Sequence, residues 1–424
     1  MSERERDRDR DCDHAACRDE LDALLTAPAF TADPYPVYAR FREEAPVHFS
    51  EANGGWMLFR YDDVHATLRD PARFSSRGRF SAALRRIDPG TRARIGPLTD
   101  HFTVGMLAND PPDHTRLRGL VNRAFTPRVV ENMRPRIHAI VGDLLDAALP
   151  RGEFDLIADF AYPLPATVIA ELFGAPAAEQ DRFKRWSNDI LGFQGTGNPE
   201  AGAVLRAQDS LLEMRAFLKD LADHRRAHPG DDLLGLLVAA EAAGDRLSEQ
   251  ELLTVCVTLL TAGHETTTNL IGNGMRLLLR HPEQLARLRE DPGLMASAVE
   301  EMLRADSPLQ RNPRQAAVDL DLGGQRIRAG DYVMQVLGSA NHDPAAFPAP
   351  ERFDIGRTPN RHVAFGGGIH FCLGAPLARL EAPIAIGEVL RRAPGLALAE
   401  PDAPPRWLRS GLLRGLERLP VAVR

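Results

Sequence analysis

The stretch from residue 362 to residue 374 constrains this chain most, because it places one cysteine in a loop of glycines and apolar residues. It reads His-Val-Ala-Phe-Gly-Gly-Gly-Ile-His-Phe-Cys-Leu-Gly, and a helical pattern with an early proline begins at Ala375. Such a helix would place free N–H groups and the positive end of its dipole beside the sulfur of Cys372, which favours a thiolate. Glycines let the backbone approach a flat, bulky group closely. A shielded thiolate of this kind suits the axial ligand of a haem iron.

Two alternatives compete with haem ligation. A lone free cysteine in apolar surroundings is usually a small buried hydrophobe. A glycine-rich phosphate loop would need a Gly-Lys-Ser/Thr ending or Gly-x-Gly-x-x-Gly spacing, and this stretch has neither. The full pattern Phe-x-x-Gly-x-x-x-Cys-x-Gly resembles the cysteine-ligand loop of the cytochrome P450 superfamily of haem-thiolate monooxygenases. The resemblance implies that Phe365, Gly366, Cys372 and Gly374 contact haem b, with Cys372 as the iron ligand.

Length and charge pattern set the expected domain organisation. Nothing in the 424 residues looks like a linker or an internal repeat, so we expect one haem-binding domain over residues 21–424. Residues 1–20 alternate in charge without an apolar face and predict a disordered tail. The tail lacks the hydrophobic segment of a secretory signal or a membrane anchor. With the resemblance, this predicts the soluble bacterial-type group and a cytoplasmic protein.

The cysteines and the net charge argue against other classes of protein. The four cysteines show no disulfide framework and no paired zinc-ligand spacing, which fits a reducing cytoplasm. The formal net charge of −7 lacks the basic footprint of a nucleic-acid-binding protein. We therefore expect neither nucleic acid nor membrane as a partner.

A second informative stretch begins with Asp110-Pro-Pro-Asp, which predicts the start of a helix. His114 and Arg118 then fall four residues apart on one face, and taken alone such a pair usually faces solvent. The two propionates of a buried haem, however, need cationic or hydrogen-bonding partners. The string His-Thr-Arg-Leu-Arg resembles the family helix that clamps a propionate. The resemblance implies that His114, Arg118, Arg314 and His370 hold the propionates.

The longest helical pattern begins at Ser248, which forms a predicted capping box with Glu251, and continues to Arg280. A helix of about 30 residues at ~1.5 Å each spans roughly 45 Å, enough to cross a whole domain. Its uncharged run, residues 252–263, is too short for a membrane span, which favours a buried core helix. Together with the resemblance, this predicts the cytochrome P450 fold: mainly α with small β-sheets, a triangular helical body and a long central helix over the haem.

The sequence Ala262-Gly-His-Glu-Thr is an odd interruption of this apolar helix. Gly263 costs about 1 kcal/mol relative to alanine. The Thr266 hydroxyl can bond back to the carbonyl of Ala262, and a buried Glu265 is expensive without a partner. A merely kinked helix with a polar face would also explain these residues. Ala-Gly-x-Glu-Thr nevertheless resembles the family's oxygen-binding groove, which implies that Glu265 and Thr266 are catalytic and manage proton delivery, with Ala262 and Gly263 against the cofactor.

Charged residues outside the site predict a structural brace. Glu301 and Arg304 stand at the family's Glu-x-x-Arg position, and Arg352 matches the third member of that charged triad. Elsewhere, strands are predicted over residues 47–49 and 56–59 around a glycine-containing turn, and further strands around Gly-Gly and Gly-Asp turns after residue 314. Helices are predicted over residues 34–42, 62–69, 135–149, 162–173 and 205–228.

Four segments resemble parts of the family that surround the substrate. Residues 71–106 carry arginines at positions 73, 77, 79, 85, 86, 92 and 94; a solvated surface is the simple interpretation, and steering of an acidic ligand or carrier protein is the alternative. Residues 190–199 contain three glycines, a composition typical of a mobile lid. Arg311 and Asn312 hint at a polar group on the ligand, and residues 410–413 resemble a loop that reaches the pocket.

The motifs occur in the family's order over roughly residues 30–424, which predicts a haem-thiolate monooxygenase. It would insert one atom of dioxygen into a C–H bond or alkene of a mostly apolar small molecule, such as a bacterial secondary metabolite. The chain has no flavin, nicotinamide or iron–sulfur segment, so electrons would come from a ferredoxin and its NAD(P)H-dependent reductase. We expect a monomer that docks the ferredoxin through exposed arginines, namely Arg116, Arg123, Arg128, Arg361 and Arg379.

Two other functions stay open at this stage. One is a haem-thiolate enzyme that uses peroxide or catalyses a rearrangement, against which the intact Glu265-Thr266 pair argues. The other is a non-catalytic haem sensor or carrier, which would need neither of these residues. The residue types in the variable segments do not identify the substrate, whether free or bound to a carrier protein.

Overall fold

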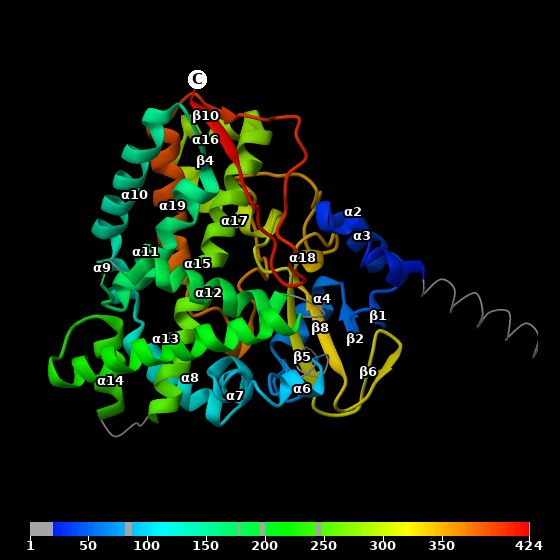
Figure 1. Ribbon diagram of the computed structural model, residues 1–424. Helices are drawn as coiled ribbons and strands as arrows, with labels where there is room; N and C mark the ends of the chain where they lie inside the picture. The colour runs from blue at the N-terminus through cyan, green and yellow to red at the C-terminus, as the bar shows by residue number, and fades with distance from the viewer. Residues whose placement is uncertain (1–19, 81–86, 177–178, 196–199, 243–246, 424) are drawn as a thin grey trace, which may run out of the picture.

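The computed structural model describes residues 20–80, 87–176, 179–195, 200–242 and 247–423. All of the predicted charged tail except its last residue lies outside these ranges. Over the described ranges the chain is mainly helical with small sheets, which confirms the predicted fold class. Figure 1 shows most helices gathered on one side and the largest sheet on the other, with α15 between them.

The largest sheet of the described chain has the strand order β1-β2-β8-β5-β3. β1 (Val47–Ser50) pairs antiparallel with β2 (Gly55–Leu58), so the hairpin predicted in this region is confirmed. β2 also pairs in parallel with β8 (Tyr332–Val336), which in turn pairs antiparallel with β5 (Arg311–Ala316). β3 (Phe74–Ser75) closes the sheet against β5. The sheet thereby joins the N-terminal region to the segment that carries Arg311 and Arg314.

Two smaller sheets complete the β structure of the described residues: a three-stranded sheet of order β4-β10-β9, and the hairpin β6-β7. The turn of this hairpin is Gly323-Gly324, with φ of 57° and 77°, a region of backbone conformation that favours glycine. Their strands are β4 (Glu153–Asp155), β6 (Leu320–Leu322), β7 (Gln325–Ile327), β9 (Leu396–Leu398) and β10 (Pro420–Val423).

All five predicted helices outside the motifs are present, and the one predicted from residue 205 begins at Ala201. The α-helices are α2 (Pro28–Ala32), α3 (Tyr35–Glu44), α4 (Tyr61–Leu68), α6 (Pro89–Arg92), α7 (Gly96–Val104), α8 (Asp113–Ala124), α9 (Pro127–Asn132), α10 (Arg134–Ala148), α11 (Pro163–Leu172), α12 (Gln180–Gly195), α13 (Ala201–Ala227), α14 (Leu233–Ala242), α15 (Glu249–Arg280), α16 (Pro282–Glu290), α17 (Met295–Ala305), α18 (Leu337–Ala340) and α19 (Ala375–Arg392). Short 3₁₀ or π turns are η1 (Met106–Ala108), η2 (Leu149–Arg151), η3 (Ile157–Ala161), η5 (Pro292–Leu294) and η6 (Gly368–His370).

The central helix α15 has the predicted bounds and the predicted cap. The Ser248 hydroxyl accepts from the N–H of Glu251, and the Glu251 carboxylate accepts from the N–H of Ser248. α15 packs against α11, α13, α17 and α19, so most of its length is buried. Among the described residues, no helix combines the length and the apolar character needed to traverse a bilayer.

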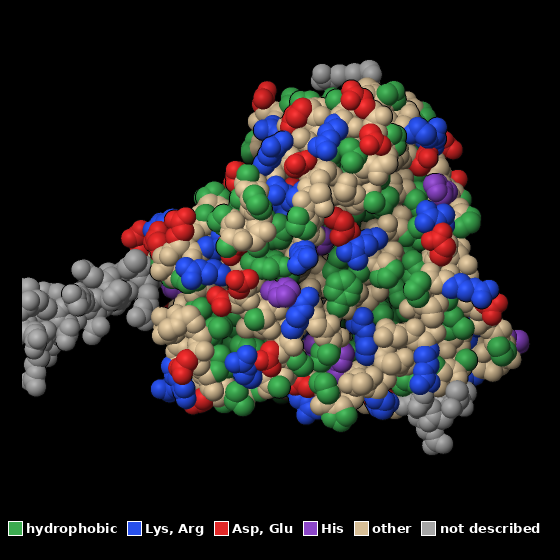
Figure 2. Space-filling model, turned by 180° about the vertical axis from the view of Figure 1, so that it is seen from behind, with side chains coloured by type: hydrophobic (Ala, Val, Ile, Leu, Met, Phe, Trp, Pro, Cys, Tyr) green, Lys and Arg blue, Asp and Glu red, His purple; other side chains and the backbone are tan. Residues whose placement is uncertain are grey.

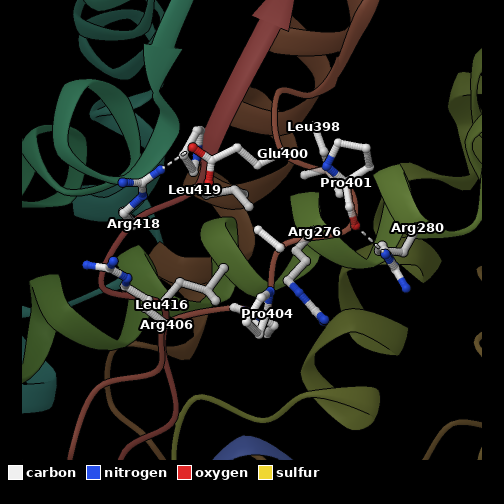
Figure 3. Close-up of a pocket in the computed structure, with 13 residues that line it drawn as sticks. Arg276, Arg280, Leu398, Glu400, Pro401, Pro404, Arg406, Leu416, Arg418 and Leu419 are labelled. Carbon is white, nitrogen blue, oxygen red and sulfur yellow. Dashed lines mark hydrogen bonds and ion pairs between the residues drawn. The ribbon is translucent and has the colours of Figure 1, made fainter.

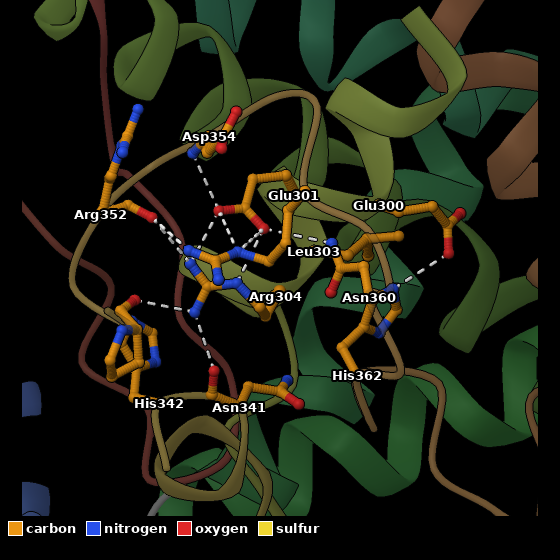
Figure 4. A network of polar contacts seen from close by, with 12 residues as sticks. Glu300, Glu301, Leu303, Arg304, Asn341, His342, Arg352, Asp354, Asn360 and His362 are labelled. Atoms are coloured by element: carbon orange, nitrogen blue, oxygen red, sulfur yellow. Dashed lines mark hydrogen bonds and ion pairs between the residues drawn. The ribbon is translucent and has the colours of Figure 1, made fainter. Parts of the chain in front are cut away.

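A buried charged network connects α17 to the loop that leads toward Cys372 (Figure 4). Glu301 and Arg304, both fully buried, share two hydrogen bonds of 2.8 Å. Nε of Arg357 donates to both Glu301 oxygens, at 3.2 and 3.1 Å. Asn360 donates a further bond to the same carboxylate. We call this network the Glu301 brace. The third member of the charged triad is Arg357, so the prediction of Arg352 is wrong.

The turn that contains Arg352 explains the difference. The carbonyl oxygens of Pro348, Ala349 and Arg352 accept hydrogen bonds from Arg357, and the carbonyl of Arg352 also accepts from Arg304. The turn therefore points its carbonyl groups at the guanidinium groups. The side chain of Arg352 is directed away from Glu301 (Figure 4).

The glycine-containing segment predicted as a lid is partly helical. α12 continues through Gly192 and ends at Gly195, and residues 196–199 lie outside the described residues, so the lid stays a prediction. On the face seen in Figure 2, acidic and basic side chains are interspersed, with several basic side chains around a cluster of apolar ones.

Candidate active site

A cavity of about 310 Å³ lies between α8, α15, β5 and the loop that carries Cys372. The C-terminal segment contributes Leu412 and Leu413, as the resemblance of residues 410–413 led us to expect. Motifs far apart in the sequence therefore meet at one place. All the residues predicted for the site line this cavity: His114, Arg118, Ala262, Gly263, Glu265, Thr266, Arg314, Phe365, Gly366, His370, Cys372 and Gly374.

The Cys372 loop is held by a backbone hydrogen bond and by close packing. The N–H of Cys372 donates to the carbonyl of Phe365 at 3.0 Å, and α19 begins directly after its N-cap residue Gly374. Gly368 has a φ of 63°, and a Cβ there would lie 2.5 Å from the carbonyl oxygen of Leu68 at the end of α4. Only glycine fits this position, and this close contact with α4 fixes where the Cys372 loop lies.

Two opposing effects act on the Cys372 sulfur. Burial is the larger effect and raises the pKa of the thiol, whereas the N–H groups of Gly374 and Ala375 and the charge of Arg118 lower it. Nη2 of Arg118 is fixed nearby by a 2.9 Å hydrogen bond to the carbonyl of Phe371. The N–H donors at the start of α19 therefore lie where a thiolate ligand needs them.

Cationic and imidazole groups gather on another wall of the cavity. His114 is 2% exposed, and neither of its ring nitrogens has a hydrogen-bond partner among the described residues. Its ring centre lies 4.2 Å from that of His370, whose Nε2 is 2.8 Å from the hydroxyl oxygen of Ser76. Burial lowers the pKa of His370 to about 2 and that of Arg314 to about 9. An anion bound at this wall would supply negative charge and hydrogen-bond acceptors to the buried imidazole and guanidinium groups.

α15 presents Glu265 and Thr266 to the same cavity. The Thr266 hydroxyl donates to the carbonyl of Ala262 at 3.0 Å, which confirms the predicted back-bond. The helix nevertheless continues unbroken through this turn. Gly263 packs closely on α11, since a Cβ there would meet the Ile169 side chain at 3.3 Å. One oxygen of Glu265 is buried without a partner among the described residues, and burial raises the pKa of this carboxyl to about 7. A carboxyl of this pKa can both release and take up a proton near neutral pH.

Arg79 is a cavity residue that the sequence did not single out. Its Nη1 donates to the carbonyl of Leu107 at 3.2 Å, Nη2 lies 3.4 Å from Oδ1 of Asn312, and Nε is buried without a partner among the described residues. Burial lowers its pKa to about 10. The solvated-surface interpretation therefore holds for Arg73 and Arg77, which are exposed, and is wrong for Arg79. Residues 81–86, with two more of these arginines, lie outside the described residues.

No signal in the sequence separates Arg79 from its neighbours. The segment has neither helical nor strand periodicity, and its arginines follow one another in a loop. The same holds for Ser76, whose contact with His370 joins residues that are 294 positions apart. The pairing of β3 with β5 and the hydrogen bonds of Ser75 and Ser76 to Asp110 bring this loop to the cavity.

The residues of the cavity fit a haem. The cysteine thiol has N–H donors beside it, and glycines allow the backbone of its loop to approach a flat group. The unpartnered nitrogens of His114 and the buried guanidinium of Arg314 match the needs of the propionates. Apolar side chains form the rest of the cavity wall. They include Leu259 and Leu270 of α15 and Leu309, which precedes β5. This fold and site define a haem-thiolate protein.

Comparison with known proteins gives the family. The cytochrome P450 family model matches residues 88–292 and 293–393. The chain is 46% identical over 399 residues to the cytochrome P450 monooxygenase PikC of Streptomyces venezuelae, a match that covers 92% of this chain and 91% of that protein. It is 40% identical over 404 residues to the polyketide biosynthesis cytochrome P450 PksS of Bacillus subtilis (strain 168), covering 93% and 96% of the two chains.

A solved structure agrees with these matches. P450BioI in complex with an acyl carrier protein ligated to hexadec-9Z-enoic acid has a TM-score of 0.85 to this chain at 38% identity, covering 93% of this chain and 100% of that one. The chain belongs to the cytochrome P450 family. It is an enzyme of the monooxygenase type, and the family implies a haem-thiolate cofactor.

Proposed function

We propose that this enzyme binds haem b and inserts one oxygen atom from dioxygen into a C–H bond or alkene of a mostly apolar small molecule. The observation that carries the proposal is the presence of Cys372, Glu265 and Thr266 on the wall of one largely apolar cavity. A sensor or carrier of haem would have no use for a buried carboxyl with a pKa of about 7 beside a threonine.

The residues that would hold the cofactor follow from the contacts above. Cys372 would ligate the iron, and His114, Arg118, Arg314 and His370 would bind the propionates. Haem bound through a thiolate supplies the cleavage of the O–O bond. The guanidinium of Arg379 lies over the ring of Phe365, 4.7 Å from the ring centre. Phe365 would keep the sulfur side of the site free of water.

Protons would reach the reacting oxygen through α15. Glu265 would release a proton into the cavity and take up another one at neutral pH, because burial raises the pKa of its carboxyl to about 7. Thr266 would hold the accepting oxygen or a water in place with its hydroxyl, once that group leaves the carbonyl of Ala262. Ala262 and Gly263 leave the space that this requires.

The test of the proposal is the ligation of iron by sulfur. The purified ferrous protein should give the red-shifted Soret band of a thiolate-bound carbon monoxide adduct. Cys372→Ser and Cys372→His should lose that band while the helical content stays the same by circular dichroism. A protein that stays colourless with added hemin, or a band unchanged in Cys372→Ser, would overturn the proposal.

Electrons would come from an external ferredoxin and its NAD(P)H-dependent reductase. Of the arginines expected to dock it, Arg116 pairs with Glu251 and Arg379 pairs with Glu300, whereas Arg128 and Arg361 are exposed and show no side-chain ion pair among the described residues. Arg128→Glu with Arg361→Glu should slow reduction and weaken its dependence on ionic strength. Arg280→Glu, at the far end of α15, is the matched control. Equal reduction rates in all three proteins would reject this docking surface.

The relatives favour secondary metabolism as the setting. PksS is named for polyketide biosynthesis, and the P450BioI structure contains a carrier-bound fatty acid, so a carrier-bound substrate is an alternative to a free one for this enzyme. A titration of the ferric protein with candidate compounds, followed by the shift in spin state, would distinguish them. Peroxide-driven turnover equal to turnover with ferredoxin, reductase and NAD(P)H would favour the peroxide-using alternative.

A further inference from the structure

Five arginines of the described chain are buried, and the partners of four of them are accounted for. Arg304 pairs with Glu301, and Arg414 pairs with Asp306 at 2.7 Å. Arg42 donates to the carbonyl oxygen and to the hydroxyl oxygen of Ser339, at 3.1 and 3.0 Å. Arg314 lies on the propionate wall of the cavity. The remaining one is Arg311, at 5% exposure.

Arg311 has no carboxylate partner within the described residues. Its Nη1 donates to the amide oxygen of Asn53 at 3.0 Å, and the guanidinium lies over the ring of Phe30, 5.2 Å from its centre. A guanidinium has five N–H donors, and no other side-chain hydrogen bond of this group is present among the described residues. A buried cation with one neutral acceptor is costly unless an anion or a strong acceptor joins it.

The position of Arg311 makes the substrate its natural partner. Arg311 lines the same cavity as Cys372, and its contacts with Asn53 of the β1–β2 turn and Phe30 of α2 set it at the sheet side of that cavity. The other cations of the cavity face the propionate wall: Asn312 accepts from both Arg79 and Arg314. Two propionates offset two of the four arginines that line the cavity, and Glu265 is the one carboxyl among the lining residues. A surplus of positive charge therefore remains after the haem is bound.

In a second cavity, the protein itself supplies hydrogen-bond and ion-pair partners to Arg280 and Arg418 (Figure 3). This hollow of about 290 Å³ lies at the end of α15 beside the β9–β10 connection. Arg280 donates to the carbonyl of Pro401, and Arg418 pairs with Glu400. Arg280 ties the loop to α15, and Arg418 ties two parts of the loop to each other, so neither arginine needs a ligand. Arg311 differs from them in being buried without such a partner.

We propose that Arg311 binds an anionic head group, a carboxylate or a phosphate, on an otherwise apolar substrate. The inference rests on the proposed function, because it assigns the substrate class of the same cavity. Apolar walls receive the body of the substrate, and the guanidinium fork receives two oxygens of the head group in the bidentate geometry that arginine favours. The head group thereby fixes which carbon lies over the cofactor.

The test compares acids with their esters on the ferric holoenzyme. Dodecanoate, dodecyl phosphate and 2-naphthylacetate are titrated beside the methyl esters of the two acids and dodecanol, and binding is followed by the shift in spin state. Wild-type enzyme should bind at least one of the anions about tenfold or more tightly than its neutral counterpart, and the stronger of carboxylate and phosphate identifies the head group. Arg311→Gln should bring that ratio close to one, and Arg311→Lys should retain part of it.

Matched variants separate this role from a structural one. Arg280→Gln removes an arginine outside the cavity and should keep the wild-type ratio. Arg79→Gln removes a cavity cation on the propionate wall and should keep it as well. No preference for any anion in the wild type, a preference that survives Arg311→Gln, or one that disappears in Arg79→Gln would overturn the inference. The carbon monoxide band of each protein distinguishes these results from a failure of the proposed function, since a normal band shows intact thiolate ligation.

Discussion

The Glu301 brace and the active-site cavity both bury charged groups, and they differ in how completely those groups are partnered. In the brace, the Glu301 carboxylate accepts from Arg304, Arg357 and Asn360. In the cavity, both nitrogens of His114 and one oxygen of Glu265 have no partner among the described residues. Buried polar groups of native proteins are normally hydrogen-bonded, so unpartnered ones call for an explanation. The difference separates charges that hold the fold together from charges that await a cofactor, a proton or a substrate.

The largest expected effect comes from breaking the brace. Glu301→Ala leaves two guanidinium groups without their carboxylate, and we expect the free energy of unfolding to fall by about 3–5 kcal/mol. Denaturant titration followed by circular dichroism measures it. Glu131→Ala, which removes an exposed Glu–Arg pair with the same three-residue spacing, is the control and should shift the midpoint little. Equal shifts in the two variants would show that burial does not set the value of the brace.

A third buried carboxyl sharpens the comparison. Glu381 on α19 is 1% exposed, one of its oxygens has no partner among the described residues, and burial raises its pKa from 4.5 to about 8. The protonated carboxyl is compatible with burial. The free energy of unfolding is therefore highest below the pKa of the unfolded state, 4.5, and falls as the pH rises to the pKa of the folded state, about 8. Between these two pKa values, ionisation of Glu381 should lower the free energy of unfolding of the wild type by about 1.4 kcal/mol per pH unit. Urea titrations across the window should give a shallower slope for Glu381→Gln, and equal slopes would contradict the prediction.

The identity of the third member of the triad, beside Glu301 and Arg304, gives the next effect. Arg357→Ala removes the bonds to Glu301 and to three carbonyl groups, which should cost about 2 kcal/mol. Arg352→Ala removes a side chain that points away from Glu301 and should cost much less. Thermal unfolding of the two holoproteins compares them directly. A larger loss in Arg352→Ala would restore that residue to the triad.

The smallest effect on stability is expected on the cavity side. Thr266→Ala removes one back-bond to Ala262, so the midpoint of unfolding should move by less than about 1 kcal/mol. Its effect on function should be large, because reducing equivalents would be diverted to hydrogen peroxide and water. Product formed per NAD(P)H consumed, with peroxide measured in parallel, gives the result. Wild-type coupling in the variant would remove Thr266 from the proton path.

What the sequence could predict depends on whether the cause is local. The capping box at Ser248 and the Gly323-Gly324 turn are set by residues within one turn of chain, and both are observed. The site residues could be located because the motifs carry their own spacing. Arg352 and Arg79 were misjudged for a different reason. Which way a loop arginine points depends on where distant carbonyl groups and carboxylates lie, and no local pattern encodes that.

The packing of Gly368 against the end of α4 has a consequence for biosynthesis. The ligand loop takes its place against a segment translated some three hundred residues earlier, and the nearby wall is completed by Leu412 and Leu413. A nascent chain that has been translated only as far as α15 contains α4 but neither the Cys372 loop nor these two leucines. Premature termination before Cys372 would therefore yield a product without the cysteine proposed to bind the iron, even when α4 has already formed.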